Sequence, residues 1–372
     1  MKKIFYLLLL TIIKLNAQVN IPLIDTLIYK TPVDISEYYK YVNKAEMAIV
    51  KGDYKNASDL YYKAFEKHYP LFEDLLNSNK IDKKLAFDSV KFQKQIILWR
   101  KISYTTTTAK EFLQGVYSFY PELDSNLVLS YEHIIDTVKF VARRNDKLKK
   151  QIDSLYKKDQ DIRINRVSRS EFIKADSSNY YELLSLIENN TVNFNTVGVN
   201  SMQNIYTMLY HQSRYNFTEW IPVIYKQVLN GNFPNKKFAE LIDNHLLFNF
   251  SSNLDSSAFA YKYGYALYDK YIIPQGVISQ QNIEKINKRR AKIMLDDIIS
   301  QQKKQVWNFR NGLDISLYSF FSLIDVSLEP SKEEIQQAKE QRNNYINKLK
   351  RKYKKLLIFD INSNNYDINL KP

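Results

Sequence analysis

The sequence predicts an all-α protein with a helical-repeat-like N-terminal domain, a second α-helical domain and a C-terminal basic helix. Apolar residues recur at helical spacing along most of the chain. The 372 residues include only seven Gly and nine Pro, fewer than the many turns of a β-sandwich or barrel require. A hydrophobic share of 45% is enough to build cores. At roughly 100–200 residues per domain, this length fits two or three domains.

Residues 1–17 are predicted to be a secretory signal peptide. Two lysines precede the nearly unbroken apolar run from Ile4 to Ile13, and Ala17 is a small residue before a cleavage site at Gln18. The alternative is a membrane anchor, but such a run spans about 15 Å as a helix, half of the ~30 Å hydrocarbon core. We therefore expect a bacterial protein that is periplasmic or secreted, with no transmembrane span in the mature chain.

Residues 18–142 are predicted to form the first domain, which contains a pair of helices between residues 38 and 70. A turn at Lys51-Gly52-Asp53 separates the helices, and the small Ala45 and Ala57 let them approach closely. The pattern G-D-Y-x-x-A-x-x-x-Y-x-x-A, which starts at Gly52, resembles a single tetratricopeptide repeat. The resemblance implies helical neighbours, because one repeat cannot bury its own faces.

Further helices are expected along the rest of this domain. Residues 71–100 continue with apolar residues at helical spacing, and Thr108-x-x-Glu111 fits a capping box for a helix that begins near Ala109. Another helix is predicted from about residue 126 to residue 142. A charged bridge follows, and we place the domain boundary there, at residue 143.

The second domain, residues 143–305, contains a charged pair on an apolar helix face. Leu148, Ile152 and Leu155 form a helical stripe, Asp159 falls inside it, and Arg163 lies one turn further on. Charged groups on such a face must be paired or bound to a ligand, because unpaired burial is costly. The two residues are expected to form either an ion pair that joins two helices or a catalytic or ligand-binding pair in a cleft.

Other polar residues of this domain also have two interpretations. Asp176 and Ser178 precede a helix predicted over residues 180–188, and either is an N-cap candidate. Asp176 is alternatively a ligand-binding residue. His211 lies opposite the apolar side of a helix predicted over 200–213 and is either structural or functional. His245 is expected to be a core histidine. The candidate catalytic residues are Asp159, Arg163, His211 and Asp243, and the candidate ligand-binding residues are Gln160, Asp176 and Asn179.

The order of these residues resembles a bacterial domain-of-unknown-function family over about residues 148–276. The family pattern reads DQ-x-x-R, D-x-x-N, His, A-x-L-x-D and YG, matched here by Asp159 to Arg163, Asp176 to Asn179, His211, Ala239 to Asp243 and Tyr263-Gly264. The family occurs in exported and cytosolic proteins and implies no reaction. The chain departs from it at Tyr210, Asn244 and Tyr265-Ala266, where the family tends to have Gln, Arg and Thr-Gln. These departures weaken the case for activity here.

Residues 306–372 are predicted to form an extension with a basic helix and a polar tail. From Ser331 onward an apolar seam repeats at a spacing near 3.5, and the outer face carries Lys348, Lys350, Arg351, Lys352, Lys354 and Lys355. These cations either favour the negative end of a surface helix or contact an anionic envelope surface such as lipid headgroups. No recognised nucleic-acid motif accompanies them, so no nucleic acid partner is expected.

Composition excludes several kinds of chemistry. The absence of Cys excludes disulfides, thiol catalysis and cysteine metal sites, and no two Gly stand two apart, which excludes G-x-G and Walker phosphate loops. The four His are far apart in sequence, so no metal or cofactor is predicted. The sequence favours an exported scaffold or binding protein that mediates protein or peptide interaction. The alternative is a hydrolase with a carboxylate/His cleft in the second domain, so enzymatic activity is left open.

Overall fold

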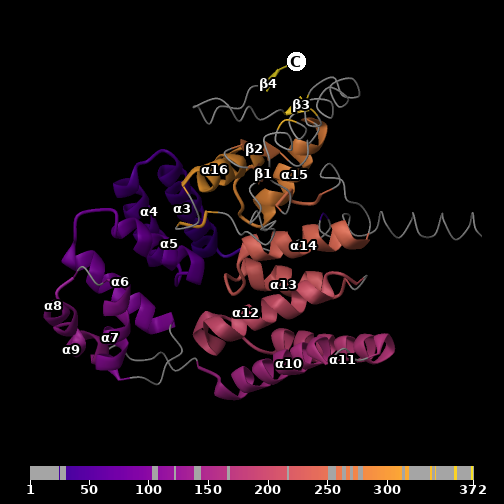
Figure 1. The fold of residues 1–372 in the computed structure, drawn as a ribbon, viewed down its shortest axis with the longest axis horizontal. Coiled ribbons are helices and arrows are strands. Elements are labelled where there is room, and N and C mark those ends of the chain that lie inside the picture. Colours follow the sequence, from indigo (N-terminus) through magenta and orange to yellow (C-terminus); the bar gives the residue numbers. More distant parts are fainter. Residues whose placement is uncertain are drawn as a thin grey trace, which may run out of the picture. The chain divides into compact units, whose positions relative to one another are not determined.

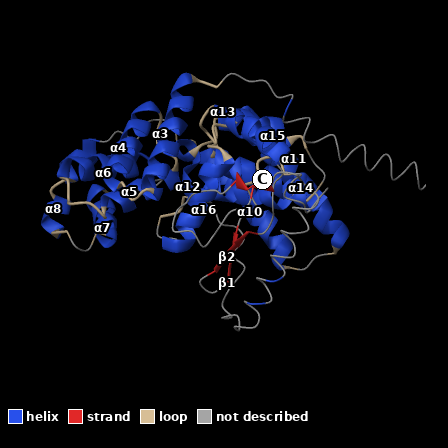
Figure 2. Cartoon of the chain, turned by 90° about the horizontal axis from the view of Figure 1, so that it is seen from above, coloured by secondary structure: helices blue, strands red, loops and turns tan. Residues whose placement is uncertain are grey.

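The computed structural model is helical over most of the residues that it describes, and this confirms the all-α class (Figure 1). Helices dominate a second view of the chain as well (Figure 2). Described strands form two small antiparallel pairs, β1 (Tyr265–Tyr268) with β2 (Tyr271–Pro274) and β3 (Leu356–Leu357) with β4 (Leu370–Lys371). The described residues are 25, 31–102, 108–120, 123–137, 144–165, 168–215, 218–249, 257–261, 265–268, 271–274, 280–311, 315–317, 336, 340, 356–357 and 370–371.

The chain divides into two compact units. The first, here called the 33–212 unit, comprises Val33–Gln212 and Asn230–Phe233. The second, the 213–372 unit, comprises Met1–Pro32, Ser213–Leu229 and Pro234–Pro372. The predicted domain boundary at residue 143 lies inside the 33–212 unit.

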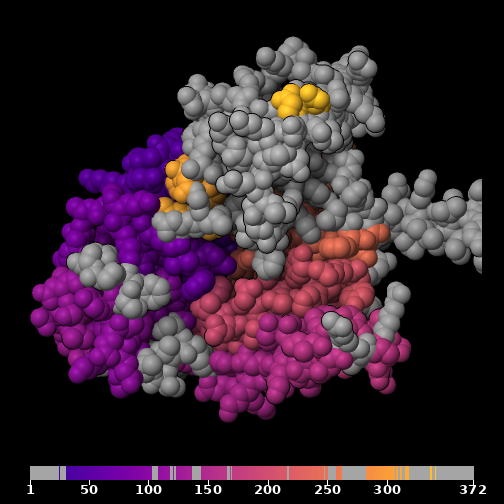
Figure 3. All heavy atoms as spheres, viewed as in Figure 1, coloured from indigo at the N-terminus to yellow at the C-terminus, as the bar shows by residue number. Residues whose placement is uncertain are grey.

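The 33–212 unit is a succession of helices in which α3 to α6 pack on their neighbours in sequence, whereas α6 also contacts α9 and α12. The space-filling view colours the described residues of this unit from indigo to pink along the sequence (Figure 3). The helices are α3 (Val33–Val50), α4 (Tyr54–Lys67), α5 (Phe72–Asp82), α6 (Ser89–Ile102), α7 (Ala109–Phe119), α8 (Ser125–Leu129), α9 (Glu132–Thr137), α10 (Asp146–Ile164), α11 (Arg169–Asn189) and α12 (Phe194–Gln212), the last with a non-helical break at Gly198.

The helix pair predicted between residues 38 and 70 is confirmed as α3 and α4. Asp53 ends the turn between them, and its side chain accepts a hydrogen bond from the Asn56 backbone N–H at 3.3 Å. Ala45 and Ala57 are fully buried, and Tyr61 is buried beside them. Small side chains therefore allow the close contact that the sequence predicted, whereas the assignment to a tetratricopeptide repeat stays a prediction.

Helices α6 to α9 share one hydrophobic core. The Phe92 ring of α6 is central to it, with edge contacts to Tyr120 and Tyr131 at 5.3 and 5.4 Å between ring centroids. The predicted capping box is present, because Thr108 and Glu111 exchange hydrogen bonds at the start of α7. The single helix predicted over 126–142 is wrong: Ser130 and Tyr131 separate α8 from α9, and residues 138–142 lie outside the described part.

The described helices of the 213–372 unit are α13 (Trp220–Leu229), α14 (Asn235–Asn249), α15 (Gln280–Lys292) and α16 (Ile298–Asn311). Its core contains the buried rings of Trp220, Phe238 and Phe259. The Phe238 ring centroid lies 6.3 Å from that of Trp220 and 6.1 Å from that of Phe259. The fully buried Arg290 donates to the Phe259 carbonyl at 2.7 Å. A charged side chain thus ties α15 to the loop that follows α14.

Several predictions fall on residues outside the described part of the chain. These are the signal peptide at 1–17, the Tyr263-Gly264 pair and the basic face from Lys348 to Lys355. Within the part that is described, no helix combines the length and apolar character needed to cross a membrane.

Two glycines with positive φ provide a test of packing in the 33–212 unit. Gly52 has φ +78° with open space around a Cβ, whereas Gly231 has φ +71° and its Cβ would lie 2.5 Å from Ile35 Cδ1 and 2.9 Å from the His68 ring. We expect Gly52→Ala to cost about 1–2 kcal/mol through backbone strain alone. Gly231→Ala should cost roughly 1–3 kcal/mol more, because the methyl group overpacks the site.

Urea denaturation of the full chain and both variants measures this difference. Gly52→Ala serves as the control for the left-handed backbone. Equal losses of unfolding free energy in the two variants would contradict the close approach of Ile35 and His68 to the Gly231 backbone.

Candidate functional site

Three helices of the 33–212 unit, α10, α11 and α12, carry most of the predicted site residues. Helix α10 packs against both of the others, and all three pairs are in contact. Asp159 and Arg163 are on α10, Asp176 is on α11 and His211 is on α12. We call these four side chains the α10–α12 charge cluster.

The apolar spacing of α10 turns Asp159 inward, as predicted. The buried residues of the helix are Leu148, Ile152, Leu155 and Asp159, at intervals of four, three and four. Asp159 has no exposed surface. Its carboxylate therefore needs partners within the protein, because water cannot solvate it.

Arg163 supplies the first partner and bridges two carboxylates. Its Nη2 donates to Asp159 Oδ1 at 2.8 Å and to Asp176 Oδ1 at 3.0 Å, while its Nε donates to Asp159 Oδ2 at 3.3 Å. The Phe172 ring covers the guanidinium, with 4.8 Å from Cζ to the ring centroid. Of the two predicted arrangements, this geometry favours the ion pair that joins helices, here α10 to α11.

His211 brings α12 to the same carboxylate. Its Nδ1 lies 3.0 Å from Asp159 Oδ2 and 3.0 Å from Arg163 Nε. Arg163 Nε always carries a proton and already has Asp159 as acceptor, so the consistent assignment has His211 Nδ1–H donating to Asp159. Burial alone raises the pKa of Asp159, but the hydrogen bonds from His211 and Arg163 outweigh it and hold the pKa below its ordinary value.

The N-cap interpretation of Asp176 is wrong. Helix α11 begins much earlier, because Ser168 and Glu171 form a capping box, and Asp176 lies within the helix. Asp176 is buried, and its backbone carbonyl accepts from Gln212 Nε2 at 3.2 Å. A charged side chain in the middle of this helix is explained by Arg163.

The candidate ligand-binding residues Gln160 and Asn179 lie on α10 and α11. Gln160 Nε2 donates to Asp159 Oδ2 at 2.8 Å, so it adds a third donor to that carboxylate. Asn179 is buried three residues after Asp176, and its Nδ2 has no hydrogen-bond partner among the described residues. The structure therefore connects Gln160 directly to the charge cluster and places Asn179 one helical turn from it.

Asp243, the fourth catalytic candidate, belongs to the 213–372 unit and has its own partners there. Its carboxylate accepts backbone hydrogen bonds from Ala258 and Phe259, both at 3.0 Å, and from Tyr261 at 2.5 Å. Asn244 donates to the Ser213 hydroxyl. His245 is the predicted core histidine: it is buried, which lowers its pKa, and its Nδ1 lies 3.1 Å from the Ser213 carbonyl. Asp243 thus anchors a loop.

The charge cluster is chemically self-contained. Two carboxylates, of Asp159 and Asp176, face one guanidinium and one imidazole, and the ion pairs among these four groups join α10 to both α11 and α12. Among the described residues, no group of three or more His, Asp or Glu side chains is arranged to hold a metal ion. The cluster is therefore best described as a set of buried ion pairs and hydrogen bonds that links three helices.

Sequence reasoning missed a groove in the same unit, which we call the lysine-rimmed groove. It has a volume of about 540 Å³ and lies among α4, α6, the turn after α5 and the residues after α7. The only sequence signal is the apolar Leu85-Ala86-Phe87 between charged residues in a turn. The groove is lined by Lys55, Asp82, Lys83, Leu85, Ala86, Phe87, Asp88, Lys91, Phe92, Gln95, Tyr120 and Leu123.

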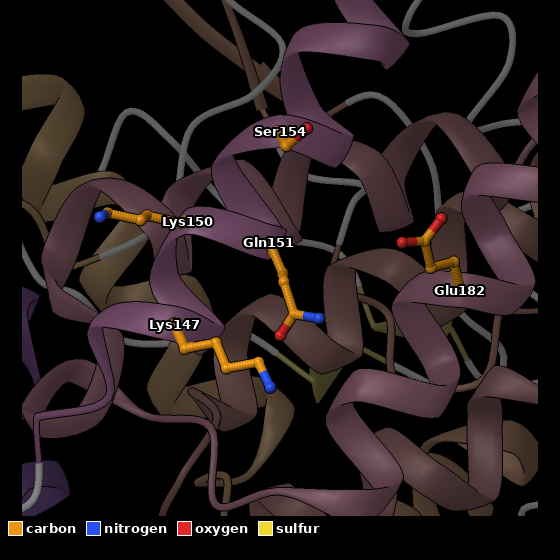
Figure 4. Close-up of a pocket in the computed structure, with 5 residues that line it drawn as sticks. All are labelled: Lys147, Lys150, Gln151, Ser154 and Glu182. Atoms are coloured by element: carbon orange, nitrogen blue, oxygen red, sulfur yellow. The ribbon is translucent and has the colours of Figure 1, made fainter.

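A second, more open groove lies between α10 and α11 (Figure 4). Its volume is about 460 Å³, and no residue of the charge cluster lines it. Glu182 comes from α11, whereas the other lining side chains all come from the N-terminal half of α10, namely Lys147, Lys150, Gln151 and Ser154. It lacks apolar and aromatic lining residues, which most ligand pockets have, so the lysine-rimmed groove is the stronger candidate.

Comparison with protein-family models, with curated proteins and with solved structures found no match. The resemblance of residues 148–276 to a bacterial domain family therefore stays a prediction. Function is inferred below from the geometry of this chain's own side chains.

Removal of the central carboxylate tests the structural role of the charge cluster. Asp159→Ala leaves Arg163 and His211 without the acceptor that they share, and breaking one side of a buried ion pair typically costs about 3–5 kcal/mol. Asp161→Ala on the exposed side of the same helix is the matched control and should change stability by less than about 0.5 kcal/mol. Urea denaturation at neutral pH measures both.

The acid dependence of stability adds a second readout. Because folding lowers the pKa of Asp159, its contribution is fully present above the ordinary value of 3.8 and is lost as pH falls below it. The difference in unfolding free energy between the unmodified protein and Asp159→Asn should therefore shrink below about pH 4. A difference that is constant with pH, or an unchanged midpoint for Asp159→Ala, would contradict the buried pair.

Proposed function

We propose that the protein is a non-enzymatic helical binding protein that takes a protein or peptide segment into the lysine-rimmed groove. The observation that carries the proposal is a groove of about 540 Å³ that is lined by both apolar side chains and lysines. This volume is within the roughly 300–1,000 Å³ range of ligand sites, whose walls are mostly apolar with a few polar groups. Phe87 in the groove is 49% exposed and nearby Val90 is 60% exposed.

Exposed apolar side chains next to a groove support binding of a macromolecule. Single exposed apolar residues are ordinary on protein surfaces, but a contiguous patch rimmed by polar groups is typical of an interaction site. Here the exposed Phe87 lines the groove together with Leu85 and Ala86. A peptide side chain that enters the groove would remove this apolar area from water, and this burial supplies the driving force.

A second candidate function, a hydrolase that uses the charge cluster, is favoured by one observation. The Asp159 carboxylate holds His211 Nδ1, which orients the ring and leaves Nε2 to accept a proton, as in general-base catalysis. The His211 side chain is 19% exposed. However, Arg163 pairs with the same carboxylate and Asp243 is bound to backbone N–H groups. Binding is therefore the better supported function.

We also propose that the protein is exported and acts outside the cytoplasm. The basic start, the apolar run from Ile4 to Ile13 and the small Ala17 support a cleaved leader. N-terminal sequencing of the protein from the envelope or medium of an expressing bacterium should give a chain that starts at Gln18. A chain that keeps Met1 in the cytosolic fraction would contradict export.

A selection experiment tests the binding function. A random peptide library displayed on phage is selected against the full chain and then counter-screened against Ala86→Trp, in which an indole fills the groove. We expect selected peptides to lose at least tenfold in affinity for Ala86→Trp, because the large side chain takes the space of the ligand's apolar group. Fluorescence anisotropy measures the dissociation constants.

The matched control is Ala291→Trp, which adds the same indole at an exposed position of α15 in the other unit. Its affinity for the selected peptides should equal that of the unmodified protein. Failure to enrich any peptide, or equal loss in both variants, would contradict peptide binding at the groove.

A further inference from the structure

We infer that the ligand of the lysine-rimmed groove is an acidic protein segment in which carboxylates flank one apolar side chain. This inference rests on the proposed function and names the chemistry that the groove selects.

The two carboxylates that line the groove already have donors within the protein. Asp82 accepts from the Ser58 hydroxyl at 2.5 Å, from the Tyr62 hydroxyl at 2.8 Å and from Gln95 Nε2 at 2.9 Å. Burial and the nearby Asp82 carboxylate raise the pKa of Tyr62, so its hydroxyl keeps the donated proton. Asp82 is therefore committed to joining α4, α5 and α6 and does not need a cation from a ligand.

Asp88 is paired with backbone groups rather than with side chains. Its Oδ1 accepts from the backbone N–H groups of Val90 at 2.9 Å and Lys91 at 3.1 Å, in the first turn of α6. A carboxylate at this position is favoured by the positive end of the helix dipole. Neither acidic residue of the groove is thus available as a strong site for a basic ligand.

Two of the lysines that line the groove, Lys55 and Lys91, can pair with a ligand carboxylate. Lys55 is exposed, and its ammonium makes no hydrogen bond or ion pair with the described residues. The Lys91 ammonium pairs with Asp59 at 2.8 Å and donates to the Ser58 hydroxyl at 2.8 Å. The Asp59 side chain is 49% exposed, and ion pairs at exposed positions are worth only about 0–1 kcal/mol. A ligand carboxylate can therefore compete with Asp59 for the Lys91 ammonium.

An aromatic ring holds a third ammonium at the groove. Lys83 lies over the Tyr120 ring, with 4.2 Å from Nζ to the centroid. Tyr120 also packs on Phe92 at 5.3 Å, so the ring belongs to the α6–α9 core. Since Lys83 follows α5, Lys55 is on α4 and Lys91 is on α6, the three positive charges that line the groove come from three different segments.

This arrangement favours a chain over a small anion. A small anion with one carboxylate pairs with one ammonium. Lysines from three segments that line the same groove as apolar side chains can instead pair with carboxylates on both sides of an apolar ligand side chain. The lining residues include three lysines and two aspartates, and both aspartates are committed as described. Complementary charges at a binding rim mainly raise the association rate and the specificity, and the apolar anchor supplies affinity.

Fluorescence anisotropy with the full chain tests the inference directly. The probe is a fluorescein-labelled, amidated peptide Asp-Glu-Phe-Glu-Asp-Leu, with Asn-Gln-Phe-Gln-Asn-Leu and Lys-Lys-Phe-Lys-Lys-Leu as matched peptides. We expect the acidic peptide to bind at least tenfold more tightly than the neutral one, the basic one to bind most weakly, and the difference to shrink on raising NaCl from 50 to 500 mM. Free N-acetylphenylalanine tests whether a small anion is sufficient.

Charge reversal at the rim assigns the site. Lys55→Glu should weaken the acidic peptide at least fivefold and leave the neutral one unchanged. Lys63→Glu, the matched control, makes the same change at an exposed position of α4 that does not line the groove, and it should have little effect. Both lysines are exposed, so neither variant is expected to impair folding.

The outcomes separate the inference from the proposed function. Equal affinities for the acidic and neutral peptides, equal effects of the two lysine variants, or full competition by N-acetylphenylalanine would overturn the acidic-segment inference. In that case, peptide binding that is abolished by Ala86→Trp would still support the proposed binding function of the groove. If none of the three peptides binds and selection enriches none, both the inference and the proposed function fail.

Discussion

The buried carboxylate of Asp159 determines how α10, α11 and α12 are joined. A carboxylate without solvent contact must be neutralised within the protein, and the donors to Asp159 come from α10 and α12. Arg163 extends the pairing to Asp176 on α11, and His211 brings in α12. Any rearrangement of these helices would leave a buried charge unpaired, so the polar contacts specify the packing that apolar contacts alone would allow to vary.

Asp82 is also paired within the protein, but unlike Asp159 it lies at a groove that is open to a ligand. Asp82 on α5 accepts hydrogen bonds from donors on two further helices, α4 and α6, and it lines a groove of about 540 Å³ that lysines also line. Because the acidic groups are committed to the protein's own donors, the electrostatic character of the opening is set by Lys55, Lys83 and Lys91. A structural constraint on the helices thereby creates a surface with a preference for one sign of charge.

Local sequence signals predicted the helices well where each signal acts within one turn. The capping box at Thr108 and the turn at Gly52 both lie where the sequence placed them. The capping box of Ser168 and Glu171 marks the true start of α11, so the helix start predicted at Asp176 does not exist. The groove gave almost no signal, because its walls come from segments that contact each other only after α4 to α8 have packed.

The sequence by itself determined the helical class, the α3–α4 pair and the inward position of Asp159 beside Arg163. All of these depend on spacing within a helix or a turn, which the order of residues encodes directly. Tertiary structure alone decided that Asp176 and His211 complete the α10–α12 charge cluster and that Asp243 anchors a loop. It also decided that lysines from three segments line one groove. These partners are separated by many residues in the chain, so their meeting depends on how whole helices pack.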